Sequence, residues 1–542
     1  MNKFVRRPIL GALFLSIFAA PVQLCAQTLS ADLSEIQFGS LQEGDPTAQV
    51  QVKLMNPLDV EVEVNDLLFT DLYGHVPFSG PSTPFTIPAG GEVSVMLYCD
   101  PVHNIEQNGQ VIFLNNSGRG ALTIDLSGQY AYGQSYYSST QNQSGDALRS
   151  ALETLLNNAT TLTYNTARDH MYMTIDNEKV NGQGASVNTL TCVYSGIQVT
   201  GYSSRTAAQN MGFNTEHTFP QSMFNSAQPM KADLHHLFPT EGSANSTRSN
   251  HPFGIVANVT SQVGLSALGT NSGGSTVFEP HDGQKGATAR AMLYFGARYP
   301  QHASFLAQQE GLMRTWSHAF PPTSVDVQRN NDIYSFQQNR NPFVDYPVLM
   351  DRVKSFSNSG PEPIDPEMLL AEQIINFAMA DSTGRYMYEF PVVNTGDAPL
   401  ILSNVTATGV GLSAEVVEPI SLSVAPGDAA RIRIYFDRSG SEYPSGSLDF
   451  NSNVFGLPNM SIPISGMDLS VSGDAQMGAV SIYPNPVKGN VQFEVLGPWQ
   501  IVNASGSKVA SGTGSARLEV QSWPQGIYFL RYSGGSTRFV VQ

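Results

Sequence analysis

Three blocks lie close together between Asn214 and Gly254: NTEHTFPQS at 214–222, KADLHHLFP at 231–239 and SANSTRSNHPFG at 243–254. Four of the ten histidines of the chain lie in this stretch. It combines an imidazole that titrates near neutrality, oxygen donors that suit a hard cation, and an arginine. These are the groups that hydrolysis of a phosphodiester requires.

The local pattern around these blocks predicts a strand, a loop and a short helix. FNTEH at 213–217 reads as a strand that enters a loop near Pro220. After Pro239, the segment 240–250 favours a short helix with Thr240 near its cap. Glu241, Asn245 and Arg248 then share one helix face at i, i+4 and i+7. An amide oxygen and a guanidinium would therefore lie side by side.

Within this arrangement His217 is the candidate proton acceptor, and Glu216 and Asn245 are the candidate metal ligands. Magnesium keeps several of its waters, so one or two protein oxygens are enough to hold it. Adjacent strand residues point to opposite faces, so Glu216 and His217 cannot both aim at one phosphate from a regular strand. Either the backbone bends there, or one of the two residues has another role.

Further helices are predicted around these blocks. Ser144 is a candidate cap for a helix whose apolar stripe is Leu148, Leu152, Leu155 and Leu156. Helical patterns also run over 286–299 and 304–317.

An internal repeat flanks the central region. TIPAGGEVSVMLYCD at 86–100 matches SVAPGDAARIRIYFD at 423–437, and the sequence around Asn56 matches that around Asn394. Short alternating strands between Gly, Pro, Asn and Asp turns predict a small β-sandwich for each copy. Cys99 takes the place of Phe436, which favours a thiol packed in the core over a bridge to Cys192. Both copies resemble the immunoglobulin-like modules of large bacterial surface proteins, which implies spacers; binding of carbohydrate or a surface is the alternative.

The ends of the chain predict export. Lys3, Arg6 and Arg7 precede the apolar run 8–20, and LCAQ offers a cleavage site near Ala26, which is typical of a signal peptide. No later run is long and apolar enough to span a bilayer. The tail, with YPNPVKGNV from Tyr483 and PQGIYFLRY from Pro524, resembles the C-terminal sorting domain of type IX secretion. That resemblance implies passage across the outer membrane by the type IX machinery, whereas a third structural sandwich is the alternative.

Net charge also separates the central region from its flanks. The chain carries −17, although a basic surface favours binding to nucleic acid. Residues 133–355 hold 14 of the 28 Lys and Arg and 15 of the 45 Asp and Glu, so that region carries −1 and the remainder −16. We expect the acidic flanks to aid solubility, and the central region to depend on a bound cation or to attract its substrate weakly.

The central region resembles the bacterial endonuclease I family of ββα-metal (His-Me finger) nucleases. The resemblance rests on NTEHTFPQS, DLHHLFP, NSTRSNHPFG, FEP at 278–280, KGATARAMLYF from Lys285 and RNNDIYSFQQNRNPFVDYP from Arg329. It implies one divalent metal, magnesium with manganese or calcium as alternatives, held by Glu216 and Asn245, with His217 as the general base. Arg248 and Arg290 are then candidates for holding the scissile phosphate, and His235, His236 and Glu241 for supporting the metal site. Asp326 stands where the family's pattern has a glutamate, which leaves that minor role open.

These observations predict a multidomain chain in which an α+β nuclease core lies between two all-β immunoglobulin-like sandwiches and a small β-sandwich follows. The predicted boundaries are a signal peptide at 1–26, a sandwich at 28–130, the nuclease at 133–355, a linker at 356–366, a second sandwich at 367–469 and the sorting domain at 479–542.

The expected protein is a monomeric, secreted or surface-bound endonuclease with little sequence preference, which cuts DNA and leaves 5′-phosphate ends; RNA stays open as a further substrate. Two alternatives stay open at this point. Asp233, His235 and His236 beside Glu216-His217 would suit a zinc hydrolase, and an adhesin with a degenerate core would bind extracellular DNA without cutting it.

Overall fold

The structure is a computed structural model that describes residues 28–70, 72–357, 360, 364–379, 384–440, 442–468, 487, 489–493, 498–503, 508–514, 516–521, 523, 526–532 and 535–541. The predicted signal peptide at 1–26 and the YPNP opening of the tail motif lie outside the described residues, as does part of the predicted linker. No helix in the described ranges is long and apolar enough to cross a membrane.

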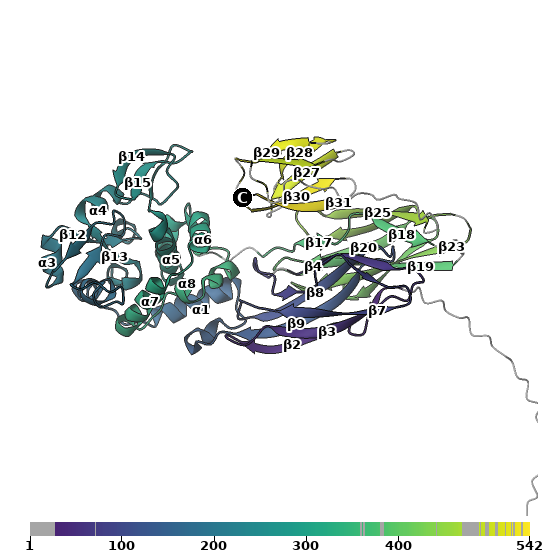
Figure 1. The fold of residues 1–542 in the computed structure, drawn as a ribbon, viewed down its shortest axis with the longest axis horizontal. Helices are drawn as coiled ribbons and strands as arrows, with labels where there is room; N and C mark the ends of the chain where they lie inside the picture. The colour runs from purple at the N-terminus through teal and green to yellow at the C-terminus, as the bar shows by residue number, and fades with distance from the viewer. Residues whose placement is uncertain are drawn as a thin grey trace, which may run out of the picture.

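The molecule is elongated, with a mixed α/β region at one end and two β-sandwiches side by side at the other (Figure 1). The small C-terminal β-module lies against the sandwich end in this view (Figure 1). The predicted fold class is confirmed, since β-rich regions flank an α+β core.

The first sandwich packs a four-stranded sheet, in the order β1-β3-β7-β5, against a five-stranded sheet, in the order β2-β9-β8-β4-β6. Its strands are β1 Ser30–Ala31, β2 Glu35–Gln42, β3 Ala48–Met55, β4 Val62–Phe69, β5 Phe78–Ser79, β6 Phe85–Ile87, β7 Glu92–Cys99, β8 Glu106–Asn115 and β9 Leu122–Ala131. In β7, Val95, Leu97 and Cys99 are buried and alternate with more exposed residues, as the sequence predicts. Cys99 is a free thiol in this core, and Cys192 is a free, buried thiol of the central region.

The second sandwich repeats the first, with sheets β17-β19-β23-β21 and β18-β25-β24-β20-β22. Its strands are β17 Met368–Leu370, β18 Ile375–Met379, β19 Gly384–Asn394, β20 Leu400–Thr408, β21 Leu412–Glu418, β22 Ser423–Val424, β23 Ala429–Arg438, β24 Gly446–Ser452 and β25 Asn459–Asp468.

The repeat reaches the level of single side chains. Asn56 donates from its amide to the backbone oxygens of Val60 and Ile87, and Asn394 donates in the same way to Ala398 and Val424. Both asparagines are buried, so each satisfies backbone carbonyls that would otherwise lack a partner. The two matching asparagines of the sequence therefore serve as the same internal brace.

The central region has eight α-helices, six 3₁₀ turns, one π turn and three small sheets within its fully described span 133–355. The α-helices are α1 Gly145–Asn157, α2 Tyr164–His170, α3 Arg205–Asn210, α4 Gly242–Arg248, α5 Asp282–Arg298, α6 Glu310–Ala319, α7 Ser324–Gln337 and α8 Pro342–Asp345. The shorter turns are η1 Ser135–Thr140, η2 Met171–Ile175, η3 Gln221–Phe224, η4 Met230–Ala232, η5 Leu234–His236, η6 Pro300–Leu306 and η7 Pro347–Arg352. The strands are β10 Thr189–Thr191, β11 Gln198–Thr200, β12 Phe213–His217, β13 Leu237–Glu241, β14 Asn258–Val263, β15 Ser266–Thr270 and β16 Thr276–Glu279.

The helix predictions are confirmed in part. Ser144 precedes α1 as expected, and Leu148, Leu152 and Leu156 are buried. The helix predicted over 304–317 is wrong at its start, because η6 ends at Leu306 and α6 begins only at Glu310. Thr240 lies next to the cap of α4, as predicted: Glu241 takes the cap position, and Thr240 is still paired in β13. The hairpin pairing extends further than the sequence pattern indicates.

Direct contacts join the central region to the first sandwich. The rings of Tyr132 and Tyr346 stack with centroids 3.7 Å apart, and the Tyr346 hydroxyl donates to Glu43 at 2.6 Å. Arg352 donates to the side-chain oxygen of Asn104 at 2.6 Å. The second sandwich contacts the first through an ion pair of 2.8 Å between Arg431 and Asp125, and it contacts the central region through one of 2.8 Å between Asp397 and Lys354.

The C-terminal module consists of a two-stranded sheet, β26-β29, and a four-stranded sheet, β28-β27-β30-β31, around its own apolar core. Its strands are β26 Asn490–Phe493, β27 Pro498–Asn503, β28 Lys508–Thr513, β29 Ala516–Glu519, β30 Gly526–Tyr532 and β31 Gly535–Val541.

Candidate active site

The candidate site is built on a β-hairpin followed directly by a helix. β12 pairs antiparallel with β13 over its whole length, so that Glu216 lies opposite Phe238 and His217 opposite Leu237. α4 starts at the residue after β13 and packs against β12. The strand predicted over 213–217 is thus confirmed, and the three elements form a ββα unit.

Glu216 lies in a buried group of charged and polar side chains. Tyr194 donates its hydroxyl proton to Oε1 of Glu216 at 2.8 Å, and Nε of Arg248 is 3.1 Å from the same oxygen. The arginine N–H is not aimed at the oxygen, so this contact is an ion pair rather than a hydrogen bond. Burial raises the pKa of Glu216, while Arg248 and Tyr194 oppose that rise. Both contacts use Oε1, and within the described residues no hydrogen bond to Oε2 is recorded.

Arg248 connects α4 to the end of β12. Its side chain is completely buried, donates to the backbone oxygen of Thr218 at 2.7 Å and to that of Ser249 at 2.9 Å, and packs over the ring of Phe253. Asn245 lies one turn before Arg248 on the same helix. Asn245 therefore lies on the face of α4 that carries Arg248.

His217 ends β12 and has a different set of neighbours. Its Nε2 lies 3.1 Å from the backbone oxygen of Lys231, and its Nδ1 lies 3.2 Å from the side-chain nitrogen of Gln221. A carbonyl only accepts, so Nε2 carries the proton in the neutral ring and Nδ1 keeps its lone pair. Burial, followed by His236, lowers the pKa of His217 to about 3, so the ring is neutral at pH 7. The arrangement therefore leaves Nδ1 as the proton acceptor.

The contacts of Glu216 and His217 do not overlap, as expected for adjacent strand residues. Glu216 contacts Tyr194 and Arg248, whereas the His217 ring packs against Tyr164 at 5.6 Å and His236 at 5.5 Å. Arg248 nevertheless reaches both the Glu216 carboxylate and the backbone at Thr218, directly after His217. The two groups are thus held at the end of one strand by the same side chain.

His235 and His236 are buried beneath the site. His235 Nε2 donates to the backbone oxygen of Asn339 at 3.1 Å, and His236 Nε2 donates to that of Met230 at 2.6 Å. Asp233 caps η5 and lies in a buried ion pair of 2.6 Å with Arg298. Glu241 accepts a hydrogen bond from the Ser243 hydroxyl at the start of α4. Among the described residues, no group of three His, Cys, Asp or Glu is arranged to hold a metal ion.

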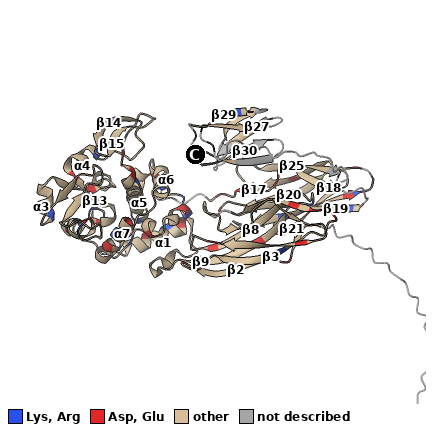
Figure 2. Cartoon of the chain, viewed as in Figure 1, with Lys and Arg blue, Asp and Glu red and all other residues tan. Residues whose placement is uncertain are grey.

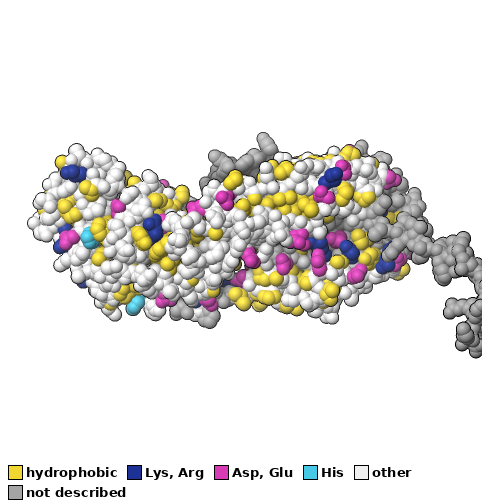
Figure 3. Space-filling model, turned by 90° about the horizontal axis from the view of Figure 1, so that it is seen from below, with side chains coloured by type: hydrophobic (Ala, Val, Ile, Leu, Met, Phe, Trp, Pro, Cys, Tyr) yellow, Lys and Arg dark blue, Asp and Glu magenta, His cyan; other side chains and the backbone are white. Residues whose placement is uncertain are grey.

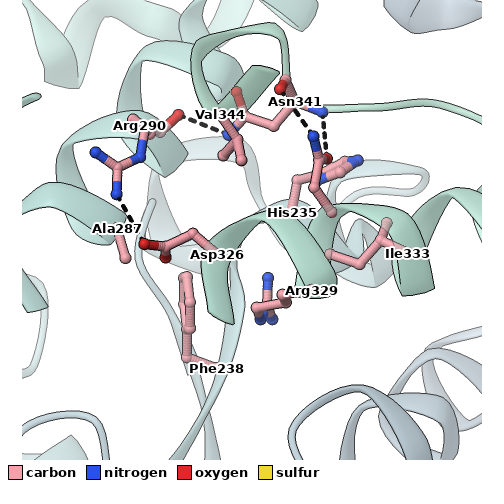
Figure 4. A pocket seen from close by; sticks show the side chains of 10 residues that line it. His235, Phe238, Ala287, Arg290, Asp326, Arg329, Ile333, Asn341 and Val344 are labelled. Carbon is pink, nitrogen blue, oxygen red and sulfur yellow. Dashed lines mark hydrogen bonds and ion pairs between the residues drawn. The ribbon is translucent and has the colours of Figure 1, made fainter. Parts of the chain in front are cut away.

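Arg290 lines a small pocket together with Phe238 of β13, and Asp326, Arg329 and Asn341 also line it (Figure 4). It is buried, donates to the backbone oxygen of Phe320 at 2.7 Å and pairs with Asp326 at 3.2 Å. Asp326 also closes a capping box with Thr323 at the start of α7. Arg248 and Arg290 are therefore both buried and paired with carboxylates, and their contacts to phosphate stay predictions.

Comparison with known proteins identifies two parts of the chain. The Endonuclease I family model matches residues 144–348. Residues 144–348 are an Endonuclease I domain. The model of the secretion-system C-terminal sorting domain matches residues 481–542. The protein is therefore secreted or held at the cell surface, and its Endonuclease I domain is a hydrolase of nucleic acid.

Individual relatives agree with this assignment. The chain is 28% identical over 243 residues to an extracellular ribonuclease of Bacillus amyloliquefaciens, and the matched region covers 41% of this chain and 78% of that protein. It is 32% identical over 116 residues to a periplasmic deoxyribonuclease of Aeromonas hydrophila, which covers 21% of this chain and 48% of that protein. The structure of a protein of unknown function from Porphyromonas gingivalis matches at 8% identity, over 81% of this chain and 98% of that chain, with a TM-score of 0.17.

Several residues around the site were not found from the sequence. Tyr194, Tyr164 and Gln221 contact Glu216 or His217 from other elements. Of these three, only Gln221 lies within one of the sequence blocks, NTEHTFPQS. No pattern there predicts its contact with His217. A separation of 22 residues between Tyr194 and Glu216 leaves no periodic signal from which their contact could be read.

Proposed function

We propose that the protein is a divalent-metal-dependent endonuclease that hydrolyses DNA, and also RNA, with little sequence specificity and leaves 5′-phosphate ends. The observation that carries the proposal is that Arg248 of α4 contacts both the Glu216 carboxylate and the backbone directly after His217. The same helix carries Asn245. Relatives named as a ribonuclease and a deoxyribonuclease support both substrates.

The residues at this position suit magnesium. Oε2 of Glu216 and the amide oxygen of Asn245 are hard oxygen donors, and one or two such donors are sufficient because magnesium keeps its waters. The Nε2 atoms of His235 and His236 are directed at backbone carbonyls, which argues against a zinc site of three imidazoles. When bound, the cation would withdraw negative charge from the phosphate as the reaction proceeds. Manganese or calcium would fit the same oxygen donors.

In this proposal His217 takes the proton of the attacking water at Nδ1. The hydrogen bond from Nε2 to the Lys231 carbonyl orients the ring and stabilises the imidazolium that forms. Gln221 lies on the same lone pair and is partly exposed, so its amide gives way to the water when substrate binds. Arg248 is a positioning residue: it fixes the Glu216 carboxylate and the turn after His217. His235 and His236 form the buried support beneath.

An assay on plasmid DNA and on RNA, with and without EDTA, tests the proposal. Cleavage that stops with the chelator and returns with magnesium supports it, and the new ends should accept a kinase label only after phosphatase treatment. Activity that returns with zinc but not with magnesium would indicate another kind of hydrolase. Binding without cleavage would indicate a nucleic-acid-binding adhesin.

A further inference from the structure

The cations of the Endonuclease I region differ in whether an acidic residue balances them. Of the 14 Lys and Arg in residues 133–355, most form ion pairs. The paired cations are Arg149, Arg205, Arg248, Lys285, Arg290, Arg298, Arg314, Arg329, Arg340 and Lys354. Four cations form no ion pair with an acidic side chain of the described chain: Arg168, Lys179, Lys231 and Arg352.

Two of these four cations meet over one aromatic ring. The Arg168 guanidinium lies 4.1 Å from the centroid of Tyr164, and the Lys231 ammonium lies 5.0 Å from the same centroid. Arg168 and Tyr164 are one turn apart on α2, and Lys231 comes from η4, which packs against α2. Attraction between each cation and the ring holds both at this position.

This ring is next to the candidate base. The centroids of Tyr164 and His217 are 5.6 Å apart, and the backbone oxygen of Lys231 accepts the His217 Nε2–H. One residue therefore fixes the imidazole through its backbone and carries a positive charge over the neighbouring ring through its side chain.

The hydrogen bonds of Arg168 leave it capacity for another partner. Its Nη2 donates to Asn165 at 2.6 Å, whereas its Nε is buried without a partner. A buried N–H without an acceptor is costly, and a guanidinium matches the geometry of phosphate oxygens. Two positive charges without acidic partners lie beside one base, and an anion bound between them would neutralise that charge.

We propose that Arg168 and Lys231, held on the Tyr164 ring, bind a backbone phosphate of the nucleic-acid substrate beside His217. This inference rests on the proposed nuclease function and gives the phosphate contact to this pair in place of Arg248 and Arg290. Phosphate contacts of this kind position any sequence equally, which agrees with a nuclease of low specificity.

The test measures binding of the full chain to a fluorescent DNA duplex at several salt concentrations. The background is His217→Ala, so that the duplex is not cut. Arg168→Gln and Lys231→Met should each weaken binding and lower the slope of log affinity against log salt by about 1. Arg168→Lys should recover part of the affinity. The control is Lys179→Gln, which removes an unpaired but exposed cation on another loop and should leave both affinity and slope unchanged.

Kinetics with His217 intact separate this inference from the proposed function. Arg168→Gln and Lys231→Met should raise KM more than they lower kcat, because they weaken substrate binding rather than remove the base. If the parent protein cuts nucleic acid and both variants bind and cut as Lys179→Gln does, the inference is wrong and the nuclease function stands. If the parent protein cuts no nucleic acid at all, the proposed nuclease function is wrong, and with it the inference that rests on it. Thermal unfolding shows which variants fold. If Arg168→Gln does not fold, binding and kinetics of Lys231→Met alone test the proposed phosphate contact.

Discussion

Glu216 and His217 are neighbours in the chain, but their side chains lie in opposite kinds of environment. The Glu216 charge is balanced by a buried arginine and a tyrosine hydroxyl. The His217 ring lies among aromatic and imidazole rings, with Arg168 and Lys231 close by and unbalanced. The difference indicates that the carboxylate side of the hairpin is complete without substrate, whereas the base side lacks a negative charge that a substrate would bring.

Removal of the base should have the largest effect on activity. His217→Ala should lower the rate of DNA cleavage by about 10²–10⁴-fold, the usual contribution of a general base. Initial rates on a plasmid measure the effect, and circular dichroism checks the fold. The control is His302→Ala, since His302 is exposed on η6 and should leave the rate unchanged. A His217→Ala protein that is folded and fully active would remove the assigned base.

Breaking the balanced side should cost mainly stability. Arg248→Met leaves the Glu216 carboxylate buried without its cation and should lower the free energy of unfolding by about 3–5 kcal/mol. Urea unfolding measures this loss. Arg205→Met is the matched control, because the Asp169 carboxylate that pairs with Arg205 is exposed. This ion pair should contribute no more than about 1 kcal/mol to the free energy of unfolding. Equal losses in the two variants would contradict the structural role of Arg248.

Acid should weaken the base side selectively. Burial lowers the pKa of His217 to about 3, that of His235 to about 4, and also that of His236. Because these rings take up a proton more readily in the unfolded chain, unfolding is favoured increasingly as pH falls below about 6.5. The slope is at most about 1.4 kcal/mol per pH unit for each ring that stays neutral in the folded state.

Urea unfolding at pH 7.5, 6 and 5 tests this pH dependence. Stability should be constant between pH 7 and 8 and decline from pH 6.5 toward pH 4. The decline should be shallower in a His235→Gln variant, which has one such ring fewer. Constant stability down to pH 5 would show that the three imidazoles are not buried as neutral groups.

Asn245→Ala should change stability least and still affect activity. Asn245 is partly exposed and its side chain makes no recorded hydrogen bond among the described residues, so unfolding should change by less than about 0.5 kcal/mol. The magnesium concentration for half-maximal activity should rise by at least about tenfold, since a metal ligand is lost. Asn210→Ala, at the exposed end of α3, should alter neither quantity. An unchanged magnesium requirement would exclude Asn245 as a ligand.

Charge over the whole surface agrees with a site that depends on local contacts. Basic and acidic positions are interspersed through the Endonuclease I domain (Figure 2). On the face shown in Figure 3, acidic side chains gather over the sandwiches, and few lie over the nuclease end. With no broad basic surface on this face, binding would depend on a few phosphate contacts and a bound cation.

The modular order, the repeated sandwiches with their matching asparagines, the strand at 213–217 and the helix after it could all be predicted from the residues alone. These features follow from alternation, turn residues and ordered blocks, which are local properties of the chain. His217, Glu216 and Asn245 were also named from these blocks, and their roles stay predictions.

The pairing of charged side chains, by contrast, became visible only in three dimensions. Arg248 and Glu216 are 32 residues apart, and Arg290 and Asp326 are 36 apart, so no local pattern reveals that these pairs are buried together. The same holds for Tyr164, Arg168 and Lys231, which meet only where α2 packs against η4. An ion pair depends on distance and burial in three dimensions, and the residue types alone specify neither.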